Sequence, residues 1–345
     1  MLLEIGSLPM EWGGWLPGIQ LAYHTYGEYH PDHTPVVWVC HPLTASSEVP
    51  VWWKDLFEPE GVFDPRRCFI ICVNNLGSCY GSTGPLSLNP ETGQPYYDSF
   101  PLITIRDIAR SMIEARKKLG IESIHVLIGG SMGGQIALEW ALQEPERIQN
   151  LILIACNAKH SAWGIAFNES QRMAIRADPT YYERRPEGGQ AGLRAARSIA
   201  LLSYRNYQTY VHFQSDDSIT PPPARRPVTY QQYQGEKLVR RFNAYSYVTL
   251  SYAMDSHDIF RNRTPDFLST LSARTLIIGI EQDILFPICE QIFLHENIPN
   301  STLRIIQSLY GHDGFLVDTH KIQAVIEEFL RDDGRFFMSK TYEAD

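Results

Sequence analysis

Short apolar runs alternate with helical segments along most of this 345-residue chain. Runs rich in Val, Ile and Leu with polar or Gly-rich flanks are typical of buried strands. Such runs occupy residues 36–40, 69–73, 123–128, 151–155, 275–280 and 303–306. Apolar residues recur at helical spacing in residues 105–119 and 135–143. Strands that alternate with helices in this way predict an α/β fold, with a mostly parallel sheet that helices cover on both faces.

The alternation breaks at about residue 161, and strand-like runs return only at residue 275. The stretch between is rich in Arg, Tyr and Gln and has helical spacing. We therefore expect an α/β core formed by residues 1–160 and 264–345, with residues 161–263 inserted as a helical lid. An insertion here is expected to lie over the strand ends, where a lid can exclude water from a reaction. A structural embellishment without a role in chemistry is the alternative.

The motif GxSxG at residues 129–133 joins the strand-like run 123–128 to the helical run 135–143. This layout is typical of a nucleophile elbow, a sharp turn that holds a serine hydroxyl exposed at the end of a strand. Gly129 and Gly133 lack the Cβ atoms that would clash in such a turn. The sequence therefore predicts Ser131 as a nucleophile, whereas a flexible Gly-rich loop is the alternative.

A nucleophilic serine needs a histidine base, and the base needs a carboxylate that holds its tautomer. In a sheet with a nucleophile elbow the three follow in the order Ser, Asp or Glu, His. Asp283 lies in the loop after the run 275–280, and His312 lies in a Gly-bracketed loop after the run 303–306. Taken alone, Asp283 could be a helix N-cap and His312 an ordinary loop histidine. Their joint placement after two successive strands favours a triad of Ser131, Asp283 and His312.

An oxyanion hole in this arrangement uses the N–H after the nucleophile and an N–H from the loop after an early strand. The first is that of Met132. The loop HPLT at residues 41–44 is the natural source of the second. Leu43 is our candidate because Pro42 has no N–H, and Thr44 is the adjacent alternative.

Composition and charge narrow the class of protein. Hydrophobic residues make up 44% and charged residues 20% of the chain, which are ordinary values for a globular protein. The net charge is −9 and the basic residues are dispersed, so we expect no nucleic-acid partner. The N-terminus lacks a signal-peptide pattern and no run is long enough to span a membrane, so we expect a soluble, cytoplasmic protein. Among the six cysteines, Cys68 and Cys72 are four apart, but no second pair or histidine cluster lies nearby, so we expect no zinc site.

Several long motifs resemble those of one known family. They are HPLTASS, NNLGSCYGSTGPLSLNPETGQPY, FPLITIRD, GGSMGGQIALEWA, SYVTLSYAMDSHD and YGHDGFL. Together they resemble the homoserine O-acyltransferases, especially homoserine O-acetyltransferase of methionine biosynthesis, over residues 10–330. The resemblance implies an α/β-hydrolase fold with a helical lid and a homodimer. It also implies acetyl-CoA as the acyl-donor substrate, with no metal and no permanently bound cofactor.

The resemblance also assigns residues that contact homoserine. Arg197 ends the motif GLRAAR and would hold the substrate carboxylate. Tyr204 follows seven residues later on the same predicted helix, so it would share a face with Arg197. Asp313, next to the catalytic histidine, would pair with the amino group. A site for an anion and a site for a cation beside one nucleophile suit a zwitterionic amino acid.

The chain departs from the family in a few positions. Many members have a form like HALTGSS where this chain has HPLTASS, and LGG is frequent where this chain has LGS. These changes leave the chemistry intact but bear on the acyl pocket and on the docking of coenzyme A. Homoserine O-succinyltransferase, serine O-acetyltransferase, an esterase or thioesterase with the same triad, and a scaffold without activity remain alternatives.

Overall fold

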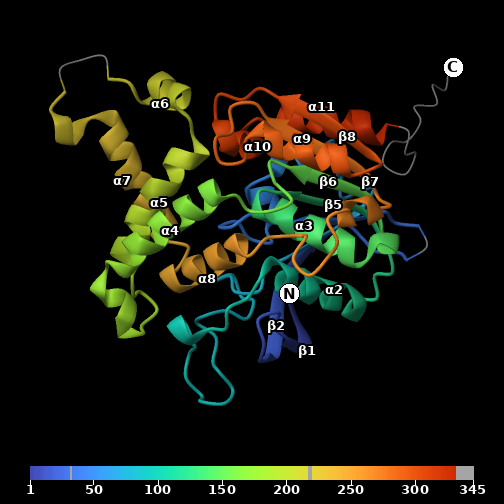
Figure 1. Cartoon of the computed structure of the whole chain (residues 1–345), viewed down its shortest axis with the longest axis horizontal. Coiled ribbons are helices and arrows are strands. Elements are labelled where there is room, and N and C mark those ends of the chain that lie inside the picture. Colours follow the sequence, from blue (N-terminus) through green and yellow to red (C-terminus); the bar gives the residue numbers. More distant parts are fainter. Residues whose placement is uncertain (32, 217–219, 332–345) are drawn as a thin grey trace.

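A single sheet runs through the protein with the strand order β1-β2-β4-β3-β5-β6-β7-β8 (Figure 1). The computed structural model describes residues 1–31, 33–216 and 220–331. Neighbouring strands from β4 across to β8 are parallel, whereas β1 pairs with β2, and β2 with β4, antiparallel. The strands are β1 (Leu2–Pro9), β2 (Trp15–Tyr26), β3 (Val36–Cys40), β4 (Phe69–Val73), β5 (Ile124–Gly130), β6 (Ile148–Ile154), β7 (Arg274–Ile280) and β8 (Ser301–Ile306). The mostly parallel sheet expected from the sequence is confirmed, and the antiparallel pair at its edge is an addition.

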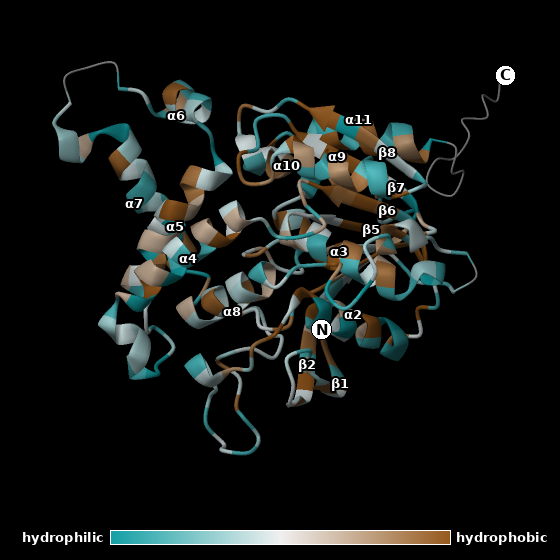
Figure 2. Cartoon of the chain, viewed as in Figure 1, coloured by the Kyte–Doolittle hydropathy of each residue, from teal (hydrophilic) through white to brown (hydrophobic). Residues whose placement is uncertain are grey.

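Each central strand contributes to two separate hydrophobic cores, because successive side chains point to opposite faces of a sheet. In β3, Val37 and Val39 pack into one core, whereas Trp38 and Cys40 pack into the other. The central strands are accordingly mostly apolar, and β3 is buried and apolar along its whole length (Figure 2). A strand buried on both faces loses the polar alternation that marks a half-exposed strand. This explains why the sequence shows these strands as unbroken apolar runs.

Helices cover both faces of the sheet, as expected. α2, α3 and α9 pack into one core, and α1, α10 and α11 into the other. These helices are α1 (Lys54–Phe57), α2 (Ile105–Lys118), α3 (Met132–Gln143), α9 (Ile288–Asn297), α10 (Gly314–Val317) and α11 (Thr319–Leu330). Helix α3 begins three residues before the predicted run at 135. The reason is that Gly133 and Gly134 interrupt its apolar periodicity.

Between β6 and β7 the chain forms a group of helices at one side of the sheet, at the left of the view (Figure 1). They are α4 (Ala162–Arg176), α5 (Gln190–Tyr204), α6 (Tyr207–Gln214), α7 (Arg226–Val239) and α8 (Ala244–Asp255). Helix α5 packs against both α4 and α7. We refer to α4–α8 and their connections as the lid. The ranges predicted for the lid and core include residues 32, 217–219 and 332–345, which lie outside the described residues.

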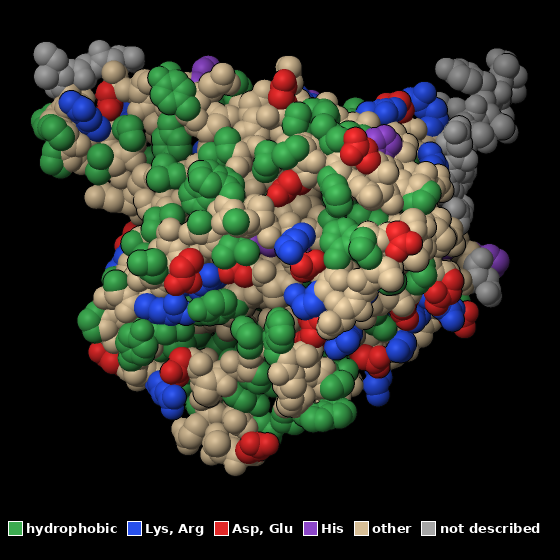
Figure 3. Space-filling view, viewed as in Figure 1, with side chains coloured by type: hydrophobic (Ala, Val, Ile, Leu, Met, Phe, Trp, Pro, Cys, Tyr) green, Lys and Arg blue, Asp and Glu red, His purple; other side chains and the backbone are tan. Residues whose placement is uncertain are grey.

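The surface in Figure 3 carries acidic and basic side chains interspersed with one another. Among the helices of the described residues, none is long and apolar enough to cross a bilayer.

The turn from β5 into α3 is held in a strained conformation by close backbone contacts. Ser131 has φ 56° and ψ −127°, in a region that L-residues rarely adopt. A Cβ atom on Gly129 would lie 2.2 Å from the Gly133 carbonyl oxygen. A Cβ atom on Gly133 would lie 2.0 Å from the carbonyl oxygen of Cys40, the last residue of β3. Both glycines of the motif are therefore required, because a side chain at either position would clash with the backbone.

We predict that Gly133→Ala destabilises the protein because the added methyl group meets a backbone oxygen that cannot rotate away. The free energy of unfolding should fall by about 2–3 kcal/mol, measured by denaturant titration. Gly279→Ala is the matched control, because its Cβ would first meet the Gln291 side chain at 3.3 Å, and its loss should stay below about 1 kcal/mol. Equal stability of Gly133→Ala and the wild type would contradict the steric argument.

Candidate active site

The elbow, the loop after β7 and the loop after β8 bring three side chains into one hydrogen-bonded chain. His312 Nε2 lies 2.9 Å from Ser131 Oγ, and His312 Nδ1 lies 2.6 Å from Asp283 Oδ2. All three side chains are buried. Because Nδ1 faces a carboxylate, it carries the proton, which leaves Nε2 free to accept the serine proton. The geometry is that of a nucleophile, its base and the carboxylate that orients the base.

Asp283 is fixed by the backbone at the start of the connection to α9. Its Oδ1 accepts hydrogen bonds from the N–H groups of Leu285 and Phe286, at 2.8 and 2.9 Å. Its other oxygen is thereby left to face His312. The ring of Phe286 stacks on His312, with the ring centroids 5.1 Å apart. Asp283 is therefore held within its own loop while it orients the histidine, and it is not the N-cap of α9, which is Pro287.

The two candidate oxyanion donors lie on segments that touch each other. Met132 is the first residue of α3, so its N–H has no partner within the helix. The contact between Gly133 and the end of β3 brings the loop at 41–44 beside this first turn. Leu43 lines the same cavity as Ser131. The structure thus places the loop that carries Leu43 next to the elbow.

His41 anchors this loop on the core side. It is completely buried, and its Nε2 accepts a hydrogen bond of 2.9 Å from the Asn75 N–H. Its Nδ1 therefore carries the proton and donates to the Pro42 carbonyl at 2.9 Å. Burial lowers the pKa of His41 to about 4, so the ring is neutral at ordinary pH. The sequence analysis did not assign a role to His41, although it heads the HPLT motif.

Ser131 opens into a cavity of about 500 Å³ between the core and the lid. One wall is apolar, and charged groups of both signs lie around the rest. Of the residues predicted from the sequence, the cavity is lined by Ser131, Leu43, Arg197, Tyr204, His312 and Asp313. Asp283 lies behind the histidine and Met132 lies at the base of the elbow. The predicted substrate residues and the triad therefore share one space.

Arg197 and Tyr204 lie on one face of α5. The Arg197 guanidinium carbon lies 5.4 Å from the centre of the Tyr204 ring, and that ring lies 5.7 Å from the ring of His312. Burial raises the pKa of Tyr204, while the Arg197 charge opposes the rise. Tyr204 therefore stays a neutral hydroxyl that connects the lid arginine with the catalytic histidine.

Asp313 has a partner that the sequence analysis missed. Arg205 Nε lies 2.8 Å from Asp313 Oδ2, as an ion pair without the alignment of a hydrogen bond. The Arg205 guanidinium also lies over the Tyr310 ring, 5.2 Å from its centre. Arg205 directly follows Tyr204 in sequence, but nothing in the local pattern indicates contact with a residue more than a hundred positions away. The carboxylate predicted to bind an amino group is thus already partly neutralised.

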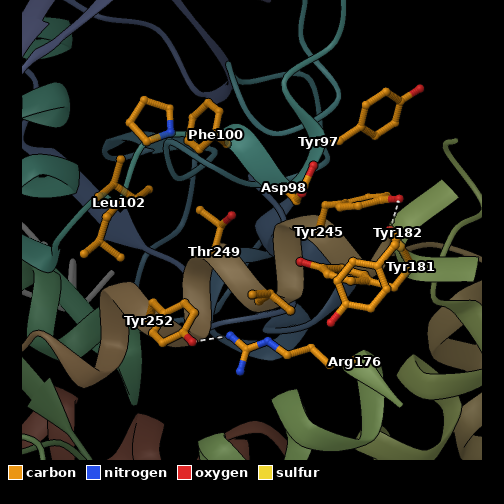
Figure 4. A pocket seen from close by; sticks show the side chains of 13 residues that line it. Tyr97, Asp98, Phe100, Leu102, Arg176, Tyr181, Tyr182, Tyr245, Thr249 and Tyr252 are labelled. Atoms are coloured by element: carbon orange, nitrogen blue, oxygen red, sulfur yellow. Dashed lines mark hydrogen bonds between the residues drawn. The ribbon is translucent and has the colours of Figure 1, made fainter. Parts of the chain in front are cut away.

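A second cavity of about 320 Å³ lies between the lid and residues 97–103 (Figure 4). Tyr97, Tyr181 and Tyr245 form aromatic walls. Its charged side chains already have partners: Asp98 accepts a 2.9 Å hydrogen bond from Arg184, and Arg176 donates to the Tyr252 hydroxyl. It shares no lining residue with the cavity at Ser131 among the described residues.

Within residues 1–31, 33–216 and 220–331, no group of three or more His, Cys, Asp or Glu side chains is arranged to hold a metal ion.

Comparisons with known proteins identify the family of this chain. Residues 35–319 match the alpha/beta hydrolase fold family. The homoserine O-acetyltransferase of Cyclobacterium marinum is 46% identical over 325 residues, which cover 94% of this chain and 92% of that protein. The homoserine O-acetyltransferase of Trichormus variabilis is 42% identical, with 93% of this chain and 90% of that protein covered.

Solved structures extend the likeness to the whole fold. The homoserine O-acetyltransferase of Bacillus anthracis is 25% identical, with a TM-score of 0.86 and 96% of both chains covered. An acetylester hydrolase from Corynebacterium glutamicum has a TM-score of 0.83 at 21% identity, covering 96% of this chain and 95% of that one, and so shares the fold. By its close relatives and its fold, this chain belongs to the homoserine O-acetyltransferase family of α/β-hydrolase-fold acyltransferases.

Proposed function

We propose that this protein transfers an acetyl group from acetyl-CoA to the hydroxyl of homoserine through an acetyl-Ser131 intermediate. The observation that carries the proposal is the cavity in which the Ser131–His312 pair lies together with Arg197 and Asp313. A nucleophile in a cavity that offers both cationic and anionic side chains suits an acceptor that is a zwitterion. The names of the relatives point to the same acceptor.

In the first step, His312 takes the proton of Ser131 while the serine oxygen attacks the thioester carbonyl of acetyl-CoA. Asp283 stabilises the imidazolium that forms. The N–H groups of Leu43 and Met132 hold the oxyanion of the tetrahedral intermediate. The intermediate collapses when its carbon–sulfur bond breaks, and His312 gives its proton to the sulfur. Coenzyme A leaves as the thiol, and the acetyl group remains on Ser131.

In the second step, homoserine enters the cavity that coenzyme A has left. Arg197 holds its carboxylate by charge-assisted hydrogen bonds, and Asp313 holds its ammonium. His312 then takes the proton of the homoserine hydroxyl, whose oxygen attacks the acetyl ester. Collapse of the second tetrahedral intermediate breaks the bond to Ser131 Oγ, which recovers its proton from His312. Each substrate thus reacts in turn with the same serine, which is a ping-pong scheme.

The wider expectations follow from this proposal. A reactive ester must be kept from water between the two steps, which gives the lid a chemical purpose. O-acetylation activates the homoserine hydroxyl as a leaving group, consistent with a step of methionine biosynthesis. We further propose a cytoplasmic homodimer that needs no metal and no permanently bound cofactor.

The direct test is release of coenzyme A from acetyl-CoA or succinyl-CoA, each with homoserine, with serine or without an acceptor. We expect rapid release only from acetyl-CoA with homoserine, and parallel double-reciprocal plots when both substrates vary. Release from acetyl-CoA that homoserine does not accelerate would instead assign a thioesterase. Rapid release with succinyl-CoA or with serine would assign one of the related transferases.

Ser131→Ala should lower kcat on the order of 10⁶-fold, because loss of a triad nucleophile removes the covalent route. The measurement is coenzyme A release with acetyl-CoA and homoserine, at matched thermal stability. Ser170→Ala is the control, since this hydroxyl lies on the exposed side of lid helix α4 and should leave the rate unchanged. Retention of more than a few thousandths of the activity by Ser131→Ala would rule out the acetyl-serine.

A second carboxyl group, that of Glu290, lies close enough to Asp283 of the triad for their charges to interact. Glu290 on α9 accepts a 3.0 Å hydrogen bond from Asn157. Burial raises the pKa of Glu290 from its ordinary value of 4.5 to about 7, and the Asp283 charge adds to the rise. Below about pH 7 the folded protein therefore keeps a proton on Glu290, which limits the negative charge beside Asp283.

We predict that Glu290 lowers the stability of the folded state as pH rises from about 4.5 to about 7. In this window the folded state holds a proton that the unfolded state has lost, so stability falls with increasing pH. Glu290→Gln mimics the protonated form. Its free energy of unfolding relative to wild type should therefore be higher at pH 8 than at pH 5.

Denaturant titrations at the two pH values measure this difference, with Glu91→Gln in an exposed loop as the control. An equal difference at both pH values would show that Glu290 ionises as an ordinary surface acid.

A further inference from the structure

The lid does more than cover the cavity, because it contacts the loops that carry the triad. The Asn206 side chain donates to the Gln282 carbonyl at 3.5 Å, beside Asp283. The Thr209 hydroxyl donates to the Leu309 carbonyl in the loop that carries His312. The end of α5 and the start of α6 therefore lie directly against both loops.

A second lid contact reaches the oxyanion loop. Arg241, just after α7, donates from Nη1 to the Thr44 carbonyl and to the Tyr80 hydroxyl, the latter at 2.7 Å. Its Nη2 lies 3.4 Å from Thr44 Oγ1. The Tyr80 hydroxyl is itself 3.5 Å from the Thr44 carbonyl. One guanidinium thus joins the lid to the residue that follows Leu43.

The contact between Arg241 and Thr44 affects the conformation of a tight turn. The Ala45 N–H donates to the Pro42 carbonyl at 3.1 Å, so Leu43 and Thr44 are the two central residues of a turn. On the core side, His41 is held by Asn75 and Pro42. On the lid side, Arg241 is the charged group that holds the turn. The Thr44 carbonyl that Arg241 holds belongs to the same planar peptide group as the Ala45 N–H. The Pro42 carbonyl that accepts from this N–H belongs to the same peptide group as the Leu43 N–H, so the Ala45–Pro42 hydrogen bond links Arg241 to the direction of the Leu43 N–H.

We propose that Arg241 is a positioning residue for acylation: it holds the 42–45 turn so that the Leu43 N–H points at the developing oxyanion. The inference rests on the proposed function in that it takes Leu43 as an oxyanion donor. It makes the lid part of the first chemical step, in addition to its role in excluding water. Preorganised donors matter because a donor displaced in the resting state loses its effect in the transition state.

Arg241 also lines the cavity and could contact the coenzyme directly. The experiment must therefore distinguish a positioning role from coenzyme binding. An acyl donor without the coenzyme makes the separation. Arg241→Met should lower the rate constant for acetylation of Ser131 about tenfold, the size expected for loss of a charged hydrogen bond. The fall should be equal for acetyl-CoA and p-nitrophenyl acetate, seen as bursts of thiol and nitrophenolate. KM and the melting temperature should change little.

Arg240→Met is the matched control, because it removes the same charge one residue away, outside the residues that line the cavity. It should acetylate at the wild-type rate. Arg241→Lys should recover part of the loss, since an ammonium can still donate to the Thr44 carbonyl. Tyr80→Phe should cause a smaller loss with both donors, because it removes one partner of the guanidinium.

A loss with acetyl-CoA alone, through a raised KM, would make Arg241 a coenzyme-binding residue and overturn the proposal. Unchanged acetylation by both donors would overturn it as well. The p-nitrophenyl acetate burst reports on Ser131 before any acceptor is used. If homoserine accepts no acetyl group but Arg241→Met still slows this burst, the proposed function fails and the positioning role stands.

Discussion

The active site depends on the contact between the end of β3 and the first turn of α3. Gly133 lies so close to the Cys40 carbonyl that no side chain fits between them. This approach places the loop after β3 beside the first N–H of α3, and it leaves Ser131 at φ 56° at the junction. The strain of that conformation is held by two parallel strands and a helix buried in the core. Ser131 and the N–H groups proposed as oxyanion donors can therefore be fixed by the backbone before any substrate binds.

The parts of the site that could be predicted from the sequence are those that local sequence patterns determine. Apolar runs mark the buried strands, and the residue after each run lies at the same edge of a parallel sheet. That rule brings Ser131, Asp283 and His312 together without a structure. The antiparallel strands β1 and β2 escape it, since a partly exposed strand mixes polar and apolar residues. The predicted start of helix α3 is three residues too late for a related reason, because Gly133 and Gly134 interrupt the apolar periodicity.

Other functional residues could not be predicted because their role lies in contacts between distant segments. Arg205 meets Asp313, and Arg241 meets Thr44, across about a hundred or more positions of sequence. Glu290 resembles any helical acid until its burial beside Asn157 is known. Only His41 carried a usable signal, as the first residue of a motif next to a buried strand. Local patterns thus locate the reacting groups, whereas the residues that tune them appear only when the chain is folded.

The fold alone does not separate transfer from hydrolysis. An acetylester hydrolase shares it over 96% of this chain, lid included. What distinguishes an acceptor from water is how firmly it is held, since well-oriented groups react with effective concentrations on the order of 10⁵ M or more. Arg197 and Asp313 line the cavity at Ser131, and in the proposed function they orient a zwitterion. The charge of Arg205 offsets that of Asp313 beside the triad. Under the proposed function, selectivity for transfer depends on these charged groups of the lid and the histidine loop more than on the triad itself.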